Sequence, residues 1–195
     1  MSWTEALGSL LGLVNIVLLV RRSIWNFPVA MAMVALIGVT LAGARLYSEA
    51  GLQAFFFVVN GWGWSLWLRA KREGADPDDA RVPVGWMTPR ARAAWALVTA
   101  VLSLSLGWVM HAFTNAALPF ADSAVTGASI AAQLLLSFRR IENWVLWIAI
   151  DVVSVALYLV RGLDLLAMLF VAFLVISGIG LRDWMRAAPR TVLAA

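Results

Sequence analysis

The 195-residue sequence contains no cysteine and a single histidine, and these shortages exclude several classes of protein. Without cysteine the chain has no disulfide framework, no thiolate metal site and no cysteine nucleophile. One histidine, His111, leaves too few groups for a histidine metal site or for the nucleophile–base pair of a membrane enzyme. We therefore expect that the protein is not an enzyme and that it carries no metal and no other cofactor.

Charged side chains are also scarce, because they make up 13% of the chain whereas hydrophobic residues make up 63%. About a quarter of the residues of a typical soluble domain are charged. A helix that crosses a hydrocarbon core of roughly 30 Å needs about 20 apolar residues. The sequence predicts an all-α polytopic membrane protein with seven spans: Glu5–Val20, Phe27–Ala44, Glu49–Leu68, Arg92–His111, Asp122–Phe138, Asn143–Val160 and Leu163–Leu181.

The connections between these spans are mostly short, and only residues 74–90 (GADPDDARVPVGWMTPR) form a long polar segment, which we interpret as a solvated linker. Of the fifteen Lys and Arg residues, only Arg45 and Arg161 lie on the side that carries the N-terminus. The positive-inside bias then places the N-terminus outside the cell and the C-terminus in the cytoplasm. This bias accounts for the net charge of +4, and we expect no nucleic-acid partner.

An internal repeat relates the first three spans to the last three. RRSIWN (residues 21–26) follows the first span and RRIENW (residues 139–144) follows the fifth, and the third and seventh spans both end in G-x-G-x-x-x-W. Aligning Arg21 with Arg139 also aligns Asn15 with Gln133. We predict two parallel three-helix repeats joined by a linker helix (3+1+3), with units 1–71, 72–111 (cytoplasmic loop and linker helix) and 112–195. Such repeats occur in transporters with a site at their interface, although a duplicated bundle without a transport role is an alternative.

Four polar residues are predicted at a similar depth in the membrane. At a rise of about 1.5 Å per residue, Asn15, Asn60 and Gln133 lie roughly 15–16 Å from one surface, and Asp151 lies roughly 12 Å from the other. Polar groups near the middle of a bilayer are functional candidates by default. The alternative is that they only form interhelical hydrogen bonds, each contributing about 0.6 kcal/mol.

Aromatic residues share helix faces with these polar residues. Helical spacing groups Gln53, Phe56, Asn60, Trp64 and Trp67 on the third span, and Trp144, Trp147, Asp151, Ser154 and Tyr158 on the sixth. Tryptophans can also be interfacial anchors, but Trp64 and Trp147 lie deeper than that role requires. Indoles beside amides and a carboxylate suit a flat heteroaromatic ligand with hydroxyls, and a cationic ring gains cation–π attraction of roughly 0.5–2 kcal/mol.

The sequence contains neither a nucleotide-binding P-loop nor a relay of acidic groups and histidines through the membrane. Proton- and ATP-driven transport both need such groups. We therefore favour a facilitator over an energy-coupled pump.

The chain resembles the PnuC family of bacterial nicotinamide riboside transporters over nearly its whole length. The resemblance lies in SWTEALGSLLGL, in RLYSEAGLQAFFFVVNGWGWSLW (residues 45–67) and in ENWVLWIAIDVVSVALYLVRGL (residues 142–163). It implies a SWEET-like 3+1+3 fold in the bacterial inner membrane and a homotrimer with one pathway per protomer. It also implies facilitated diffusion of nicotinamide riboside, an NAD precursor that a cytosolic kinase then traps.

The resemblance also implies roles for individual residues. Trp144 and Trp147 match an aromatic pair of the pathway; Gln53, Asn60 and Trp64 match a ligand-contacting stretch; Gln133 and Asp151 match polar positions of the second repeat, and some members carry Asn in place of Asp151. With the periodic faces, the predicted substrate site is Asn15, Gln53, Phe56, Asn60, Trp64, Gln133, Trp144, Trp147, Asp151 and Tyr158. The alternatives are transport of thiamine, riboflavin or a deoxynucleoside, and a receptor or scaffold that does not transport.

Overall fold

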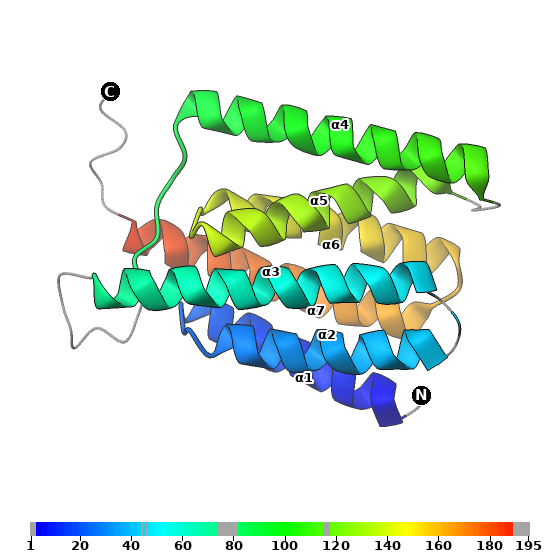
Figure 1. The fold of residues 1–195 in the computed structure, drawn as a ribbon, viewed down its shortest axis with the longest axis horizontal. Helices are drawn as coiled ribbons and strands as arrows, with labels where there is room; N and C mark the ends of the chain where they lie inside the picture. The colour runs from blue at the N-terminus through cyan, green and yellow to red at the C-terminus, as the bar shows by residue number, and fades with distance from the viewer. Residues whose placement is uncertain (1–2, 44, 46, 74–81, 115–117, 189–195) are drawn as a thin grey trace.

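The computed structural model describes residues 3–43, 45, 47–73, 82–114 and 118–188, and seven helices account for most of them (Figure 1). Their bounds are α1 (Trp3–Val20), α2 (Asn26–Gly43), α3 (Tyr47–Arg72), α4 (Pro89–Phe113), α5 (Pro119–Ser137), α6 (Glu142–Val160) and α7 (Asp164–Ala187). All seven predicted spans are therefore present as helices. The predicted end of the second span, Ala44, and residues 74–81 of the predicted linker lie outside the described residues.

Several helices are longer than the predicted spans, because polar helix ends continue past the apolar run. α3 extends to Arg72, and α4 begins at Pro89, where Thr88 is the N-cap and its side chain accepts a hydrogen bond from the Ala91 amide. Among the described residues, α2, α4, α6 and α7 are long and apolar enough to cross a membrane by length and composition. α5 is less apolar because it packs against α3, α4 and α6 and buries small and polar residues between them.

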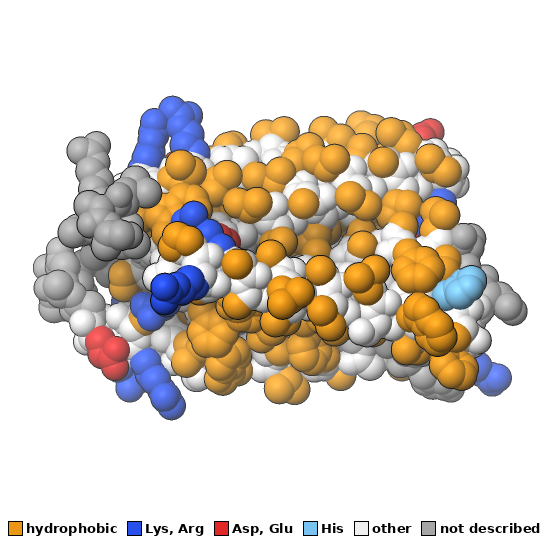
Figure 2. Space-filling model, turned by 90° about the horizontal axis from the view of Figure 1, so that it is seen from above, with side chains coloured by type: hydrophobic (Ala, Val, Ile, Leu, Met, Phe, Trp, Pro, Cys, Tyr) orange, Lys and Arg blue, Asp and Glu red, His pale blue; other side chains and the backbone are white. Residues whose placement is uncertain are grey.

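The outer surface is apolar along the length of the helices and charged at their ends. Figure 2 shows hydrophobic side chains over the long side of the molecule, and Lys and Arg gathered mainly at the end where α1, α3, α5 and α7 finish. We call this the basic end. On α4 the exposed apolar residues include Leu97, Val101, Leu104 and Trp108. A face of this kind is suited to contact with lipid.

The packing pattern of the helices has the symmetry of the predicted repeat. In the first triplet α1 packs on α2 and α2 on α3, and in the second α5 packs on α6 and α6 on α7. Between the triplets α1 packs on α7, and α3 packs on α5. Exchanging α1, α2 and α3 with α5, α6 and α7 leaves this pattern unchanged, while α4 lies outside it and packs on α5 (Figure 1). The triplets are thus related by a pseudo-two-fold axis, as the 3+1+3 prediction requires.

Equivalent hydrogen bonds fix the alignment of the two triplets. The indole Nε1 of Trp67 donates to the Leu136 carbonyl at 3.1 Å, and the indole Nε1 of Trp184 donates to the Leu19 carbonyl at 3.2 Å. Each bond runs from the last helix of one triplet to the first helix of the other. These paired bonds make Trp67 the counterpart of Trp184 and Leu19 the counterpart of Leu136.

The turns that follow α1 and α5 confirm this alignment of the two triplets. It differs by one residue from the alignment that was predicted from the sequence. Arg22 and Arg139 both adopt a positive φ, of 56° and 61°. The structure therefore aligns Arg22, and not Arg21, with Arg139. By the same register Asn15 corresponds to Ala132 and Gln133 to Ile16, so the repeat is real but its proposed Asn15–Gln133 pair is wrong by one residue.

Four fully buried aromatic residues close the basic end of the bundle: Phe27, Trp67, Trp144 and Trp184. We call them the aromatic floor. Phe27 meets Trp67 edge to face at 5.1 Å between ring centroids, and their counterparts Trp144 and Trp184 meet in the same way at 5.5 Å. Trp67 and Trp184 then contact each other across the pseudo-two-fold axis at 5.9 Å.

Residues 82–88, which lead into α4, cross the basic end beneath this floor. The Val82 amide donates to the Arg22 carbonyl at 3.3 Å, and the Gly85 amide donates to the Arg139 carbonyl at 3.2 Å. The segment thus binds the same turn of each triplet. Val82 and Val84 are buried in the aromatic core, so this half of the predicted solvated linker is packed, because its apolar residues cover the floor.

Candidate ligand-binding cavity

A cavity of about 350 Å³ lies between the two triplets, above the aromatic floor. Every helix of both triplets contributes to its wall, and α4 contributes none of the described lining residues. The lining residues are Gly12, Asn15, Ile16, Leu19, Ala30, Met33, Val34, Ile37, Gln53, Phe56, Asn60, Ser129, Gln133, Leu136, Trp144, Trp147, Ile150, Asp151, Phe170, Phe173 and Ser177. An apolar wall with a few polar groups is typical of small-molecule sites.

Most of the predicted site residues meet at this cavity. Eight of the ten line it: Asn15, Gln53, Phe56, Asn60, Gln133, Trp144, Trp147 and Asp151. Their helices come from both triplets, as a site at a repeat interface requires. The geometry therefore places the amides, the carboxylate and two indoles around one space.

Two predicted residues, Trp64 and Tyr158, are not among the lining residues. Trp64 packs against the buried core of the basic end, one turn beyond Asn60. Tyr158 packs on Phe170 at 5.2 Å between ring centroids, near the opposite end of the cavity wall. Trp64 follows the last lining residue of α3 by about one turn, and Tyr158 follows the last lining residue of α6 by about two turns, so both lie beyond the cavity along the helix axis.

An amide pair joins the two triplets across the cavity. Gln133 on α5 donates from Nε2 to Oδ1 of Asn60 on α3 at 3.1 Å, and Asn60 donates from Nδ2 to the Phe56 carbonyl at 2.8 Å. Both amides are buried. These bonds hold the Asn60 side chain in one orientation, and the Gln133 amide has a second N–H for which the described residues offer no acceptor.

A carboxylate lies on the α6 side of the same cavity. Asp151 is 3% exposed, and its Oδ2 accepts a hydrogen bond from the Ser177 hydroxyl on α7 at 3.0 Å. Among the described residues no other donor to this carboxylate is found, and none of the lining residues is Lys, Arg or His. The negative group in this cavity therefore has no protein counter-charge.

Three lining residues carry buried polar atoms without a hydrogen-bond partner in the described part of the chain. These atoms are Oδ1 of Asn15 and the indole Nε1 atoms of Trp144 and Trp147. An unpaired buried polar group costs roughly 1–3 kcal/mol. All three residues line the cavity, so small movements of their side chains would bring these polar atoms to a ligand there.

Besides aliphatic residues and Gly12, the lining residues that were not predicted are Ser129, Phe170, Phe173 and Ser177. The repeat, once in the correct register, identifies the last three. Phe173 is the counterpart of Phe56, Ser177 the counterpart of Asn60, and Phe170 the counterpart of Gln53. These counterparts could have been identified from the sequence, but the predicted alignment of the repeats was shifted by one residue.

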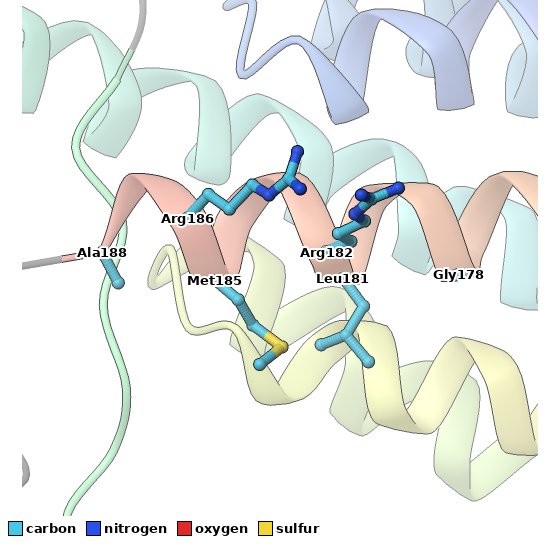
Figure 3. Close-up of a pocket in the computed structure, with 6 residues that line it drawn as sticks. All are labelled: Gly178, Leu181, Arg182, Met185, Arg186 and Ala188. Atoms are coloured by element: carbon cyan, nitrogen blue, oxygen red, sulfur yellow. The ribbon is translucent and has the colours of Figure 1, made fainter.

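A second hollow, of about 490 Å³, lies along the end of α7 at the basic end (Figure 3). Gly178, Leu181, Arg182, Met185, Arg186 and Ala188 line it, and all of them come from α7 and the residue that follows it. In Figure 3, Arg182 and Arg186 extend to one side of the helix and Leu181 and Met185 to the other. A hollow on one helix lacks the enclosure of the central cavity, which we therefore favour as the ligand site.

A bundle of two equivalent helix triplets, with an apolar exterior and a polar cavity at their interface, has the architecture of a membrane transporter. The sequence matches the nicotinamide mononucleotide transporter family over residues 2–186, and the chain belongs to that family. This result confirms the family resemblance noted from the sequence. The family and its structural neighbour are transporters and not enzymes, as expected, and they support a multi-pass protein of a bacterial inner membrane.

Similar proteins span almost the whole chain. The nicotinamide riboside transporter PnuC of Escherichia coli (strain K12) is 30% identical over 208 residues, covering 96% of this chain and 87% of that protein. The riboflavin/roseoflavin transporter RibM of Streptomyces davaonensis is 29% identical over 186 residues, covering 93% and 84%. The crystal structure of the vitamin B3 transporter PnuC matches with a TM-score of 0.79 at 24% identity, covering 95% and 82%, and confirms the seven-helix fold.

Proposed function

We propose that this protein is a facilitator that carries nicotinamide riboside across the membrane through the central cavity. The observation that carries the proposal is that amide, carboxylate and aromatic residues from both triplets, three of them with unpartnered buried polar atoms, line one space between the triplets. The riboside offers a flat ring for the indoles and ribose hydroxyls for the amides. Relatives named as nicotinamide riboside transporters support this choice.

The chemistry of the cavity favours the riboside over the mononucleotide that the family description mentions. A phosphate group carries about −1.5 to −2 charges at neutral pH and calls for Arg, Lys or a helix N-terminus. The described lining residues include no basic side chain and do include the Asp151 carboxylate. A phosphorylated ligand would therefore lose hydration without gaining a counter-charge.

The residues that line the cavity favour facilitated diffusion over proton-coupled transport. Asp151 is the one ionisable side chain among the described lining residues, and a single carboxylate does not make a proton relay. Transport then requires the cavity to open alternately to each side as one triplet moves against the other. The aromatic floor and residues 82–88 close the basic end, so this end must separate for the ligand to leave there.

We further propose that the basic end faces the cytoplasm, with the N-terminus outside, because positive residues favour the inner side. The moving halves are residues 1–71 and 112–195, and residues 72–111 connect them. The family resemblance supports a SWEET-like homotrimer that supplies NAD biosynthesis. Light scattering of the purified protein in detergent, corrected for bound detergent, tests the trimer.

Calorimetry of the purified protein tests the proposed site. We expect Trp147→Ala and Asn60→Ala each to abolish nicotinamide riboside binding while the protein stays folded, because one removes a ring and the other an oriented amide. Trp108→Ala is a matched control, since this tryptophan is 67% exposed on α4. Unchanged affinity in both cavity variants would contradict the site.

Riboflavin is the second candidate, because a relative is named as a riboflavin transporter. The cavity of about 350 Å³ is at the small end of ligand sites, which span about 300–1,000 Å³, and this favours a single ring with a ribose over a three-ring system. Calorimetry with nicotinamide riboside, thiamine, riboflavin and a deoxynucleoside separates the candidates. Uptake of the bound compound into proteoliposomes distinguishes a transporter from a receptor or scaffold.

A further inference from the structure

The two triplets share a backbone frame around the cavity but differ in charge. Val34 on α2 is the counterpart of Asp151 on α6, and Ala30 is the counterpart of Trp147. All four residues line the cavity. One side of the pseudo-two-fold axis thus presents a carboxylate and an indole one helical turn apart, whereas the opposite side presents only small apolar groups at those positions.

The Asp151 carboxylate is held in place for contact with a ligand. Ser177, which is fully buried on α7, donates to Oδ2 and also lines the cavity. The bond fixes one oxygen, and none of the described residues donates to the other oxygen, Oδ1. Within a low-dielectric bundle such a carboxylate gains most from a cationic partner, because its other option is an unpaired charge or a bound proton.

We propose that Asp151, positioned by Ser177, makes this cavity selective for heteroaromatic rings that carry a positive charge. The inference rests on the proposed ligand site and adds the rule by which that site chooses its ligand. A cationic ring beside α6 meets the carboxylate and the π face of Trp147 together, and each attracts it. The amides of Asn60 and Gln133 reach the cavity from α3 and α5, so they are placed for the hydroxyl groups of the same ligand.

A pair of probes with nearly the same size and with different charge tests this rule, and Asp151→Asn separates the effect of the charge from that of the lost aromaticity. Nicotinamide riboside is a pyridinium cation, and its reduced dihydropyridine form is a neutral riboside with the same substituents. By calorimetry in detergent we expect the unmodified protein to bind the cation roughly 10- to 100-fold more tightly, the range that a charge-assisted contact gives. Asp151→Asn should remove this preference, with less than about a threefold change for the neutral probe.

Two further variants separate charge selection from structural effects. Ser177→Ala keeps the Asp151 carboxylate but removes its hydrogen-bond donor. The preference for the cationic probe should therefore fall by less than in Asp151→Asn, and the binding of the neutral probe should not change. Asp164→Asn is the matched control, because it removes an exposed carboxylate at the start of α7 and should change nothing. Equal binding of both probes by the unmodified protein overturns the proposal, and this result stands even if a variant does not fold. An equal loss for both probes in Asp151→Asn overturns it as well.

If nicotinamide riboside is not the substrate, the binding results differ from those that would refute the charge rule. If neither nicotinamide probe binds, thiamine (a cation) and riboflavin (neutral) replace them. Thiamine binding that Asp151→Asn weakens would support the charge rule with another substrate. Riboflavin binding without thiamine binding, or binding of none of the four, would overturn it.

Discussion

The first and second triplets have the same skeleton and different side chains at the cavity. Both place a tryptophan–carbonyl hydrogen bond, a left-handed turn and an edge-to-face aromatic pair at equivalent positions. At the cavity wall, however, equivalent positions of the two triplets carry different residues. Ile16 is aligned with Gln133, Val34 with Asp151 and Asn60 with Ser177. The two triplets thus share several interactions that hold the bundle together and differ at several positions of the cavity wall.

The difference shows how a symmetric bundle could bind an asymmetric molecule, as the proposed function requires. A riboside has an aromatic end and a hydroxylated end, and a strictly symmetric cavity would offer each end the same surroundings. Here Trp147 and Asp151 lie on α6, while their counterparts on α2 are Ala30 and Val34. Under the proposed function, this asymmetry would give the riboside one preferred orientation, and the shared skeleton would let the two halves move as similar units.

The largest loss of stability should come from substituting the glycines that pack against the aromatic floor, at equivalent positions of α3 and α7. A Cβ at Gly180 would lie 2.5 Å from the Trp144 ring, and one at Gly63 would lie 2.7 Å from the Phe27 ring. We expect Gly180→Ala and Gly63→Ala each to cost about 3 kcal/mol of stability, measured by thermal unfolding in detergent. Gly178→Ala, where nothing lies within 4 Å, is the control. A large loss for only one of the pair would break the equivalence of the triplets.

Removing either of the two equivalent indole hydrogen bonds should cause an intermediate loss of stability, and the two losses should be equal. Trp67→Phe and Trp184→Phe each remove one indole N–H and part of a fully buried ring, while the Leu136 and Leu19 carbonyls keep their backbone hydrogen bonds from Arg139 and Arg22. We expect each to lower the free energy of unfolding by about 2 kcal/mol, because a typical hydrogen bond contributes about 0.5–1.5 kcal/mol and the smaller ring leaves a cavity. Values that differ by more than about 1 kcal/mol would show that one triplet carries more of the stability than the other.

Substitutions in the turns at the end opposite the basic end should cause the smallest change in stability. Arg45 adopts φ 62° between α2 and α3, and its counterpart Gly162 adopts φ 69° between α6 and α7. Glycine takes this conformation without strain, so Arg45→Gly should stabilise the protein by about 0.5–1 kcal/mol. Gly162→Ala should destabilise it by about 1 kcal/mol, with no clash since nothing lies within 4 Å of the added Cβ. A loss of stability in Arg45→Gly would contradict the turn assignment.

The sequence was sufficient to predict the seven helices, the repeat and most of the polar residues of the cavity wall, because apolar length and helical spacing determine each of them. Spacing gives the direction of a side chain but not its level along the axis, so Trp64 and Tyr158 were included although they lie outside the wall. Ser177 was missed because one serine in an apolar run does not stand out without its partner Asp151. The burial of Val82 and Val84 was hidden by the charged residues around them, since only tertiary packing shows what covers the floor.

The central claim is that a small molecule occupies the cavity between the triplets, and the absence of native cysteine allows a direct test. Ser129 lines the cavity, so Ser129→Cys provides a single thiol there, and Asp164→Cys provides an exposed thiol elsewhere. Labelling with a small maleimide would be timed with and without saturating nicotinamide riboside. We predict that the ligand slows labelling at position 129 at least about tenfold and leaves position 164 unchanged. Equal labelling rates at position 129 with and without bound ligand would contradict the account.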